Sequence, residues 1–342
     1  MFAKSISVFI VVLILSSCKN GKEAIVVSNS ELTAKFSIEI LTDEGNLVID
    51  KHSSIEILAD GFTWTEGPLY IENGDYLLFS DIPNSKVFKI DAQGKTSVYL
   101  HPSGNDVKNY TGKEAGSNAL MYYKDQLILM QQGERRIAKM KAPIDSPKES
   151  YEMIVDTYEG KRLNSPNDGV FDALGNLYFT DPPYGLPNGI NDVTKELDFQ
   201  GVYCLLTSGE LILLDKEIKY PNGITLSPDE KTLYVAASDP EKAAWYSYKI
   251  AQPGTVSDKR LFYDVTALDR DKKHKGLPDG MKTNHDGYLF ATGPDGVWVF
   301  NPNGVAIARI HTGVLTANCA LSTDESQLFL TADDYILKVT LK

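Results

Sequence analysis

The feature of this chain that most restricts its fold is an internal repeat. Each copy begins with a turn rich in Asp, Gly or Asn, continues as an apolar strand, and returns through a short loop into a second strand. The first apolar residues of the six copies are Tyr76, Leu127, Leu177, Leu233, Leu289 and Leu328. The intervals between them are 51, 50, 56, 56 and 39 residues. Strand-rich repeats of this length are typical of propeller blades with four strands.

We therefore predict an all-β fold, a single six-bladed β-propeller over residues 53–342. Nothing between the copies has the period of a long amphipathic helix, which disfavours architectures that alternate strands with helices. The chain ends on a predicted strand over 336–341, and another predicted strand over 54–58 precedes the first copy. We expect these two strands to pair, because a propeller commonly closes its ring this way and so removes two free strand edges.

The residues before the propeller have the pattern of an export signal. Lys4 is followed by an apolar run over 6–15, which is too short to span a bilayer but suits a signal sequence. The run ends in Leu15-Ser16-Ser17-Cys18, which resembles a bacterial lipobox, whose cysteine is lipidated after cleavage in front of it. We expect residues 1–17 to be a lipoprotein signal peptide and Cys18 to carry the lipid. The alternative is an ordinary cleaved signal with a chance cysteine.

Residues 18–52 are predicted to be a tether and N-terminal extension, with about 19–35 holding the domain off the membrane. The protein would then be an exported bacterial lipoprotein, attached by its lipid alone to a membrane in the periplasm or at the cell surface. Two further cysteines, Cys204 and Cys319, each lie in an apolar run. Buried free thiols are the favoured interpretation, and a disulfide is the alternative.

The charge of the chain argues against one class of partner. It has 34 Lys and Arg against 46 Asp and Glu, a formal net charge of −12. A nucleic-acid surface would need clustered basic residues instead. We expect a monomer that acts on a small molecule and not on a nucleic acid.

Polar motifs come just before the apolar strands, at matching phases of the repeat. The innermost strand of each propeller blade brings residues to the mouth of the channel, so we expect these motifs to meet on the axis. They are Glu66-Gly67-Pro68, Asn164-Ser165-Pro166-Asn167-Asp168-Gly169, Pro221-Asn222-Gly223 and Pro278-Asp279-Gly280. Each glycine would let the backbone approach whatever lies on the axis. A single Asn-Gly or Asp-Gly is commonly a turn, but four at one phase of a repeat favour a site.

One Glu, one Asp and two Asn from these motifs make a candidate metal site. Carboxylate and amide oxygens with two negative charges suit a hard cation, most of all Ca²⁺, with water or substrate completing its coordination. Zn²⁺, Mn²⁺ and Mg²⁺ are alternatives. None of the five histidines has the spacing of a metal-binding pair, and neither His nor Cys joins the set.

The same motifs, in the same order, resemble those of the gluconolactonase/regucalcin family, also known as the senescence-marker-protein family. The resemblance covers about 55–341. It implies a six-bladed propeller with one catalytic divalent cation in the channel, and the hydrolysis of sugar or other lactones. It also implies that Glu66, Asn222 and Asp279 bind the metal and that Asn167 lies beside it, on the metal or on the substrate. Asp279 would in addition be the catalytic proton donor and acceptor.

The segment from Asn164 to Asp168, together with Asp181-Pro-Pro-Tyr184-Gly, is most similar to the bacterial gluconolactonase-like branch. Regucalcin-like members carry a substrate-binding Arg two residues before the counterpart of Asn167. Ser165 stands there in this chain, so their sugar contacts do not transfer. The candidate substrate contacts of this chain are Asn164, Asn167, Asp168, Tyr184 and His285.

Three further side chains have two interpretations each. His285 could face the channel as a second acid or base, or could be a polar turn residue. Trp64 could line the pocket or fill a blade core, and Asn118 could point into the channel or belong to a surface loop.

Two alternatives to a lactonase remain. A phosphotriesterase-like or other ester hydrolase can use the same propeller with similar oxygen ligands, and a calcium-stabilised binding propeller needs no chemistry at all. The presence of both Glu66 and Asp279 favours an enzyme, because a purely structural cation site has no need of open coordination positions.

Overall fold

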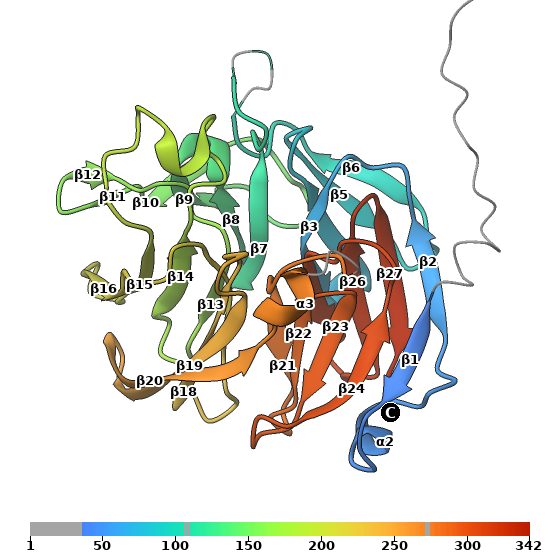
Figure 1. Ribbon diagram of the computed structural model, residues 1–342. Coiled ribbons are helices and arrows are strands. Elements are labelled where there is room, and N and C mark those ends of the chain that lie inside the picture. Colours follow the sequence, from blue (N-terminus) through green and yellow to red (C-terminus); the bar gives the residue numbers. More distant parts are fainter. Residues whose placement is uncertain (1–35, 106–107, 109, 271–273) are drawn as a thin grey trace, which may run out of the picture.

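Each copy of the repeat folds into one antiparallel sheet of four or five strands, and the six sheets follow one another around a common centre (Figure 1). The computed structural model describes residues 36–105, 108, 110–270 and 274–342. The predicted six-bladed propeller is confirmed. The predicted signal peptide, Cys18 and the tether over 19–35 lie outside the described residues.

Blades 1 and 2 follow directly along the chain, with their strands in order from the centre outward. Blade 1 contains β3 (Thr65–Ile71), β4 (Tyr76–Asp81), β5 (Lys86–Ile90) and β6 (Thr96–Leu100). Blade 2 contains β7 (Ser117–Tyr123), β8 (Gln126–Gln131), β9 (Arg136–Met140) and β10 (Tyr151–Val155). A short hairpin of β11 (Thr157–Tyr158) and β12 (Lys161–Arg162) leads to blade 3.

Blades 3 and 4 have the same plan. Blade 3 contains β13 (Gly169–Phe171), β14 (Leu177–Asp181), β15 (Gly201–Leu205) and β16 (Leu211–Asp215). Blade 4 contains β17 (Pro221–Leu226), β18 (Thr232–Ala237), β19 (Ala244–Gln252) and β20 (Thr255–Asp264). The helical segments of the described chain are all short: α2 (Gly45–Val48), α3 (Thr266–Arg270), η1 (Glu72–Gly74), η2 (Gln132–Glu134) and η3 (Gly189–Asn191).

Blades 5 and 6 each take one strand from the N-terminal part of the chain (Figure 1). Blade 5 contains β21 (Met281–Thr283), β22 (Leu289–Gly293), β23 (Gly296–Phe300), β24 (Ala306–His311) and, outermost, β1 (Ser37–Ile40). Blade 6 contains β25 (Asn318–Leu321), β26 (Gln327–Ala332), β27 (Tyr335–Thr340) and, outermost, β2 (Ile55–Ala59). The predicted pairing of the two terminal strands is confirmed, with Ile55 opposite Val339.

The strand β1 and the turn that follows it were not predicted. Ser37 lies opposite His311 in the sheet of blade 5, and Val48 and Ile49 are buried in a core shared by blades 5 and 6. Much of the segment predicted as an extension therefore packs on the propeller. The alternating pattern of β1 is only four residues long, too short to stand out from the sequence around it.

The predicted repeat has a simple structural meaning. Its six anchor residues lie at the first or second position of β4, β8, β14, β18, β22 and β26, which are the second strands of the blades. Most residues of these strands are buried, and many of them are apolar, because both faces of each strand meet a neighbouring blade.

The apolar cores lie between neighbouring blades. Between blades 4 and 5, Trp245 packs against Phe300 with ring centroids 5.4 Å apart, and Trp298 lies 6.3 Å from Trp245. Large aromatic rings of this kind contribute much of the burial that stabilises a sheet-on-sheet interface. Polar side chains lie nearer the centre of the ring.

Hydroxyl groups of the second strands hold the inner strands of the next blade. Ser80 donates to the carbonyl of Asn118 at 2.8 Å, Thr180 to that of Asn222 at 2.6 Å, and Thr292 to that of Ala317 at 2.9 Å. These bonds satisfy backbone carbonyls that water cannot reach. The first two bonds also fix the main chain of Asn118 and Asn222, two residues with polar side chains on inner strands.

Several remaining features concern the surface and the cysteines. Cys204 and Cys319 are buried free thiols, as expected.

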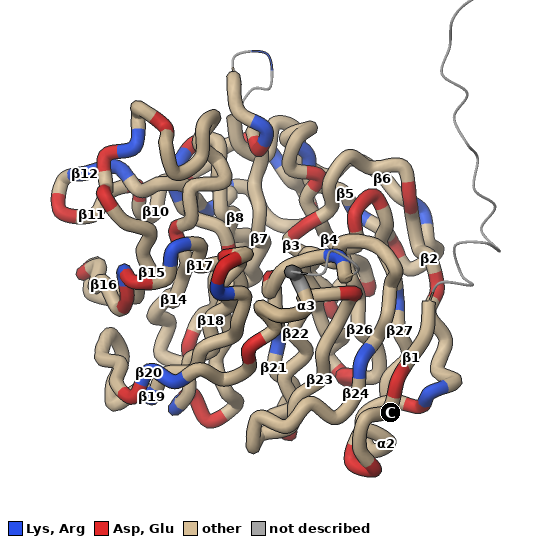
Figure 2. Tube along the Cα trace, viewed as in Figure 1, with Lys and Arg blue, Asp and Glu red and all other residues tan. Residues whose placement is uncertain are grey.

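Within the described residues, none of the helices is long and apolar enough to cross a membrane. Figure 2 shows Lys and Arg interspersed with Asp and Glu around the propeller, so that charges of both signs occur along most of the described chain.

Candidate active site

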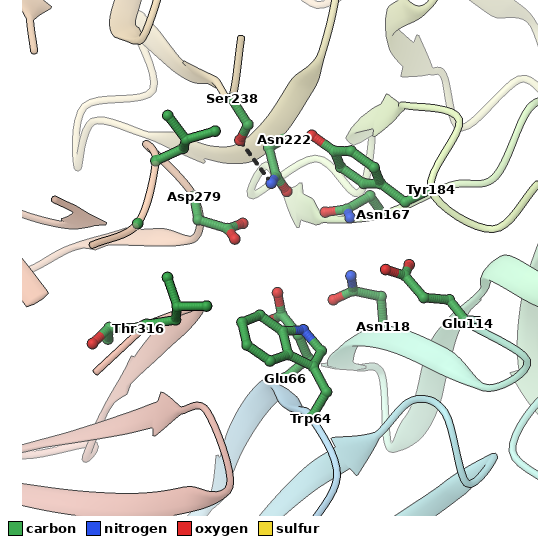
Figure 3. Close-up of a pocket in the computed structure, with 13 residues that line it drawn as sticks. Trp64, Glu66, Glu114, Asn118, Asn167, Tyr184, Asn222, Ser238, Asp279 and Thr316 are labelled. Atoms are coloured by element: carbon green, nitrogen blue, oxygen red, sulfur yellow. Dashed lines mark hydrogen bonds between the residues drawn. The ribbon is translucent and has the colours of Figure 1, made fainter. Parts of the chain in front are cut away.

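A cavity of about 360 Å³ lies where the inner strands of the propeller begin (Figure 3). Its lining is Trp64, Glu66, Glu114, Asn118, Asn167, Tyr184, Asn222, Ser238, Gly276, Leu277, Asp279, Leu315 and Thr316. All four predicted metal ligands are in this set. The structure thus brings together residues of four motifs that are far apart in the sequence.

Local breaks in the strand pairing turn polar side chains toward the cavity. The pairing of β3 with β4 shifts after Glu66, that of β7 with β8 shifts across Asn118, and that of β17 with β18 shifts across Asn222. A β-bulge of this kind re-aims a side chain that a regular strand would point into a blade interface. These three inner strands therefore present Glu66, Asn118 and Asn222 close to their first residues, whereas Asn167 and Asp279 lie just before β13 and β21.

The glycines of the motifs have a different role from the predicted one. A Cβ atom on Gly67 would lie 2.2 Å from the carbonyl oxygen of Asn118, and one on Gly223 would lie 2.1 Å from that of Asp279. The close approach is thus between the inner strands of neighbouring blades. The expectation that these glycines make room for a ligand on the axis was wrong.

Two carboxyl groups face the cavity from opposite parts of the chain. Glu66 is 2% exposed, and its Oε2 accepts a hydrogen bond of 2.8 Å from the backbone N–H of Gly67. Burial, with added repulsion from Asp168, raises the pKa of Glu66 to about 8. Burial, followed by repulsion from Glu66 and Asp168, raises the pKa of Asp279 well above its ordinary range. A cation between the two carboxyl groups would offset this repulsion.

Two asparagine side chains present free oxygens. The Nδ2 of Asn222 donates to Ser238 Oγ at 2.9 Å, while its Oδ1 is buried and has no hydrogen-bond partner. Asn118 is only 3% exposed, and its Oδ1 is likewise buried without a hydrogen-bond partner. A buried acceptor without a donor is costly, so these oxygens are suited to a cation or to a ligand that donates hydrogen bonds.

The donor set fits a hard divalent cation. Glu66 and Asp279 offer carboxylate oxygens, and Asn167 and Asn222 offer amide groups on the same cavity. Among the described residues, no three His, Cys, Asp or Glu side chains are grouped as a metal site. Such a cation would therefore depend on amide oxygens for part of its coordination, a mixture that Ca²⁺ accepts readily.

Asn164 was wrongly predicted to contact substrate. Its side chain is buried and donates to the carbonyls of Asp181 and Phe199 at 3.1 and 3.0 Å. The backbone N–H groups of Asn164 and Ser165 donate to the carboxylate of Asp181, each at 2.7 Å. The polar start of this motif thus largely holds its own loop. Asn164 Oδ1 is buried without a hydrogen-bond partner, but the residue is not part of the cavity lining.

Asp168 is also absent from the lining of the cavity, contrary to its predicted contact with substrate. Its carboxylate accepts from Gly169 N–H at 2.8 Å and from Asn318 Nδ2 at 3.4 Å. It lies behind the wall, where its charge still raises the pKa values of Glu66 and Asp279.

His285 lies outside the cavity, so its predicted contact with substrate was wrong. Its side chain is 75% exposed in the turn between β21 and β22, and its Nδ1 is paired with Glu325. Tyr184, by contrast, lines the cavity as expected, with its ring stacked on Tyr220 at a centroid distance of 6.2 Å. Trp64 and Asn118 line it as well.

Sequence reasoning missed Glu114, Ser238, Leu277, Leu315 and Thr316. Ser238 directly follows β18, and Glu114 lies in the long loop between β6 and β7. Neither residue occupies the repeated phase of the four motifs, so the period carried no signal for them. Only the folded position of their loops brings them to the cavity.

Comparison with known proteins gives consistent results. The family model described as SMP-30/Gluconolactonase/LRE-like region matches residues 64–333. A gluconolactonase of Zymomonas mobilis is 35% identical over 300 residues, which cover 86% of this chain and 83% of that protein. A diisopropyl-fluorophosphatase of Loligo vulgaris is 28% identical over 251 residues, covering 70% and 75%. The solved structure of a gluconolactonase from Xanthomonas campestris matches with a TM-score of 0.77 and 28% identity, over 90% of this chain and 95% of the other.

Proposed function

The chain belongs to the SMP-30/gluconolactonase/LRE-like family, and from this premise we propose that it hydrolyses sugar lactones in the central cavity with the help of a divalent cation. The observation that carries the proposal is the pair of carboxyl groups, Glu66 and Asp279, which face one cavity together with amide groups. A binding site for a neutral sugar alone would have little reason to hold two mutually repelling acids.

Glu66, Asn167, Asn222 and Asp279 would hold the cation. Ca²⁺ is the favoured ion because half of these ligands are neutral amides, and Mg²⁺, Mn²⁺ and Zn²⁺ are alternatives. The chemistry that such a cation supplies when bound is polarisation of the lactone carbonyl and neutralisation of the charge that develops on its oxygen.

We assign Asp279 as the proton acceptor. Its carboxylate takes a proton as a water oxygen attacks the carbonyl carbon of the lactone. The bond between that carbon and the ring oxygen then breaks, and the ring oxygen leaves as a hydroxyl after it receives a proton, so that water and lactone yield an open hydroxy acid. Burial and repulsion from Glu66 raise the pKa of Asp279 in the protein without a cation, and a cation beside it would favour the ionised form that accepts the proton.

The backbone around Asp279 is held on both sides. Asp279 N–H donates to the carbonyl of Thr292 at 3.0 Å, and Gly280 N–H donates to that of Ala317 at 2.8 Å. A base fixed in this way keeps its carboxylate within a narrow range of positions, which general-base catalysis requires. The rings of Trp64 and Tyr184 and the side chains of Leu277 and Leu315 supply apolar wall that limits access of water.

A second candidate is hydrolysis of phosphotriesters or other esters. It is supported by the similarity to the Loligo diisopropyl-fluorophosphatase over 70% of this chain. The oxygen ligands and the proton acceptor assigned above would serve such a reaction equally well. The identity to the Zymomonas gluconolactonase is higher and covers more of the chain, so the lactonase is preferred.

A substrate panel tests the two candidates. Purified protein is treated with a chelator, and acid release from D-glucono-1,5-lactone, an aryl ester and a phosphotriester is followed before and after addition of Ca²⁺, Mg²⁺, Mn²⁺ or Zn²⁺. We expect hydrolysis of the lactone above its spontaneous rate, lost on chelation and restored by at least one cation. Cleavage of the phosphotriester without the lactone would establish the second candidate. Cation binding without any hydrolysis would establish a binding propeller.

A further inference from the structure

Glu114 is a third carboxyl group in the cavity, and neither the proposed cation ligands nor the proton acceptor accounts for it. It is partly buried, and its Oε2 is inaccessible to water and has no hydrogen-bond partner. Figure 3 shows its side chain on the same part of the cavity as Asn118, Asn167 and Tyr184. A carboxyl group that is held here without a hydrogen-bond partner lowers the stability of the protein unless a ligand supplies that partner.

The loop that carries Glu114 is anchored around it. The carbonyl of Ala115 accepts from Asn105 N–H at 2.7 Å, and Gly116 N–H donates to the carbonyl of Ile82 at 2.9 Å. On the other side, the hydroxyl of Tyr110 donates to the carbonyl of Gly185, next to Tyr184. The loop around Glu114 is therefore held by a backbone hydrogen bond to blade 1 and, through the Tyr110 hydroxyl, by a hydrogen bond to the loop after β14.

Asn118 adds a second unsatisfied acceptor four residues later. Its residue is 3% exposed, its Oδ1 has no partner, and the bulge in β7 directs it into the cavity. Glu114 and Asn118 thus make one polar wall from blade 2. Leu277 and Leu315 form an apolar wall from the segments that enter blades 5 and 6.

We propose that Glu114 and Asn118 recognise the hydroxyl groups of the substrate, so that the enzyme selects polyhydroxylated lactones over lactones of the same ring size without hydroxyls. This inference rests on the proposed lactonase function and deepens it. The carboxyl and amide oxygens accept hydrogen bonds from ring hydroxyls, while the apolar wall contacts the carbon face of the ring. Glu114 is then a specificity-determining residue, and Asp279 remains the proton acceptor.

Two physical arguments support this assignment. A site built to hydrogen-bond a substrate hydroxyl rejects an analogue without it, because its buried polar groups are then left unpaired. Burial also raises the pKa of Glu114 to about 7, so near neutral pH both forms of the group are populated, and each can accept a hydrogen bond from a hydroxyl.

The test compares two substrates with the same reacting group. For native protein and the Glu114→Met variant, kcat and KM are measured with D-glucono-1,5-lactone and with δ-valerolactone, which has no hydroxyls. We expect the ratio of the two kcat/KM values to fall by about 10–100-fold in the variant, mainly through KM of the hydroxylated lactone. Glu149 is exposed and is not part of the cavity lining, so Glu149→Met removes a carboxylate elsewhere and should leave the ratio unchanged.

A binding experiment separates recognition from chemistry. D-Gluconolactam cannot be hydrolysed under these conditions, and its Kd by calorimetry should rise in Glu114→Met by a factor similar to the change in the ratio. Glu114→Gln keeps one acceptor oxygen and the shape of the side chain, so its affinity for the lactam should fall less. This variant also provides a test if Glu114→Met does not fold.

The outcomes are distinct. If native protein hydrolyses D-glucono-1,5-lactone but the ratio and the lactam affinity stay the same in both variants, the recognition role of Glu114 is overturned and the lactonase stands. If rates with both lactones fall equally, Glu114 acts on the chemistry or the fold and the inference is again overturned. If native protein hydrolyses neither lactone, the proposed function itself fails, and the inference fails with it.

Discussion

A Cβ atom added to Gly223 would lie 2.1 Å from the carbonyl oxygen of Asp279, so the inner strand of blade 4 is in direct contact with the segment that carries the proposed base. The same glycine follows Asn222, one of the proposed cation ligands. Two functional groups from different blades are thus placed relative to each other by a backbone contact that only glycine permits.

Substitution of Gly223 by Ala should therefore damage activity more than folding. The added methyl group forces the Asp279 backbone away, and we expect the free energy of unfolding to fall by about 1–3 kcal/mol. Displacement of the base should lower kcat/KM by about 100-fold, since errors of about 1 Å at a reacting group have effects of this size. Thermal unfolding and lactone kinetics on the same preparation measure both quantities.

Gly61→Ala is the control for this variant. Unlike Gly223, Gly61 has a left-handed backbone with φ of 86°, and its added methyl group would meet no atom within 4 Å. It should lose some stability and keep its kcat/KM. Full activity in Gly223→Ala would show that the contact with Asp279 does not position the base.

The roles of Asp279 and Glu66 can be separated by amide substitutions. Asp279→Asn keeps an oxygen for the cation but removes the proton acceptor, and we expect hydrolysis to fall by about 10²–10⁴-fold. Glu66→Gln should mainly weaken cation binding, so that excess cation restores part of its activity. Equal rescue of both variants by cation would mean that Asp279 is a ligand only.

Cation binding should stabilise the fold. The buried Glu66 and the Asp279 carboxyl group repel each other, and a bound cation removes that penalty in the folded state only. We expect Tm to rise with added Ca²⁺ after chelation, and the rise to be smaller in Glu66→Gln. An unchanged Tm across all four cations, at concentrations up to the millimolar range, would contradict the proposed site.

Asp215 provides a prediction on pH. Its side chain is 6% exposed and contacts Lys259 Nζ at 2.7 Å, the Tyr248 hydroxyl at 2.8 Å and Glu217 N–H at 2.6 Å. Burial by itself would raise the pKa of Asp215, but these hydrogen bonds outweigh it and hold the pKa below its ordinary value. The ionised group therefore stabilises the fold above the unfolded pKa of about 4, and this contribution disappears as the pH falls through the lower folded pKa.

We expect Asp215→Asn to lower the free energy of unfolding by about 1–3 kcal/mol at pH 7. The difference from native protein should stay constant between about pH 5 and pH 8 and shrink below about pH 4. Denaturant unfolding at several pH values measures it, with exposed Asp145→Asn as the unaffected control. A difference that does not change at low pH would mean that the charge of Asp215 is irrelevant to stability.

We also propose that Cys18 anchors the protein to a membrane by a lipid, on the basis of the lipobox-like Leu15-Ser16-Ser17-Cys18. In bacteria grown with radiolabelled palmitate, Cys18→Ala should lose the label and move to the soluble fraction. Ser17→Ala keeps a small residue before the cysteine and should retain the label. Membrane association that survives Cys18→Ala would refute the anchor.

Local, periodic patterns determined the architecture and part of the site. Alternating apolar residues and turn residues at near-equal intervals specify strands and blades, because strand formation and turn chemistry depend on neighbours in the chain. The phase of the repeat also places Glu66, Asn167, Asn222 and Asp279 at the start of the inner strands, so these residues could be predicted to converge.

The tertiary structure alone decided which other side chains join them. Glu114 reaches the cavity because its loop is anchored to blade 1 and to Gly185, whereas Asn164 turns to Asp181 and His285 to Glu325. The position of a long loop and the partner of a polar side chain depend on groups that are remote in sequence. No period records such contacts, and only the folded chain, which brings these groups within hydrogen-bond distance, determines them.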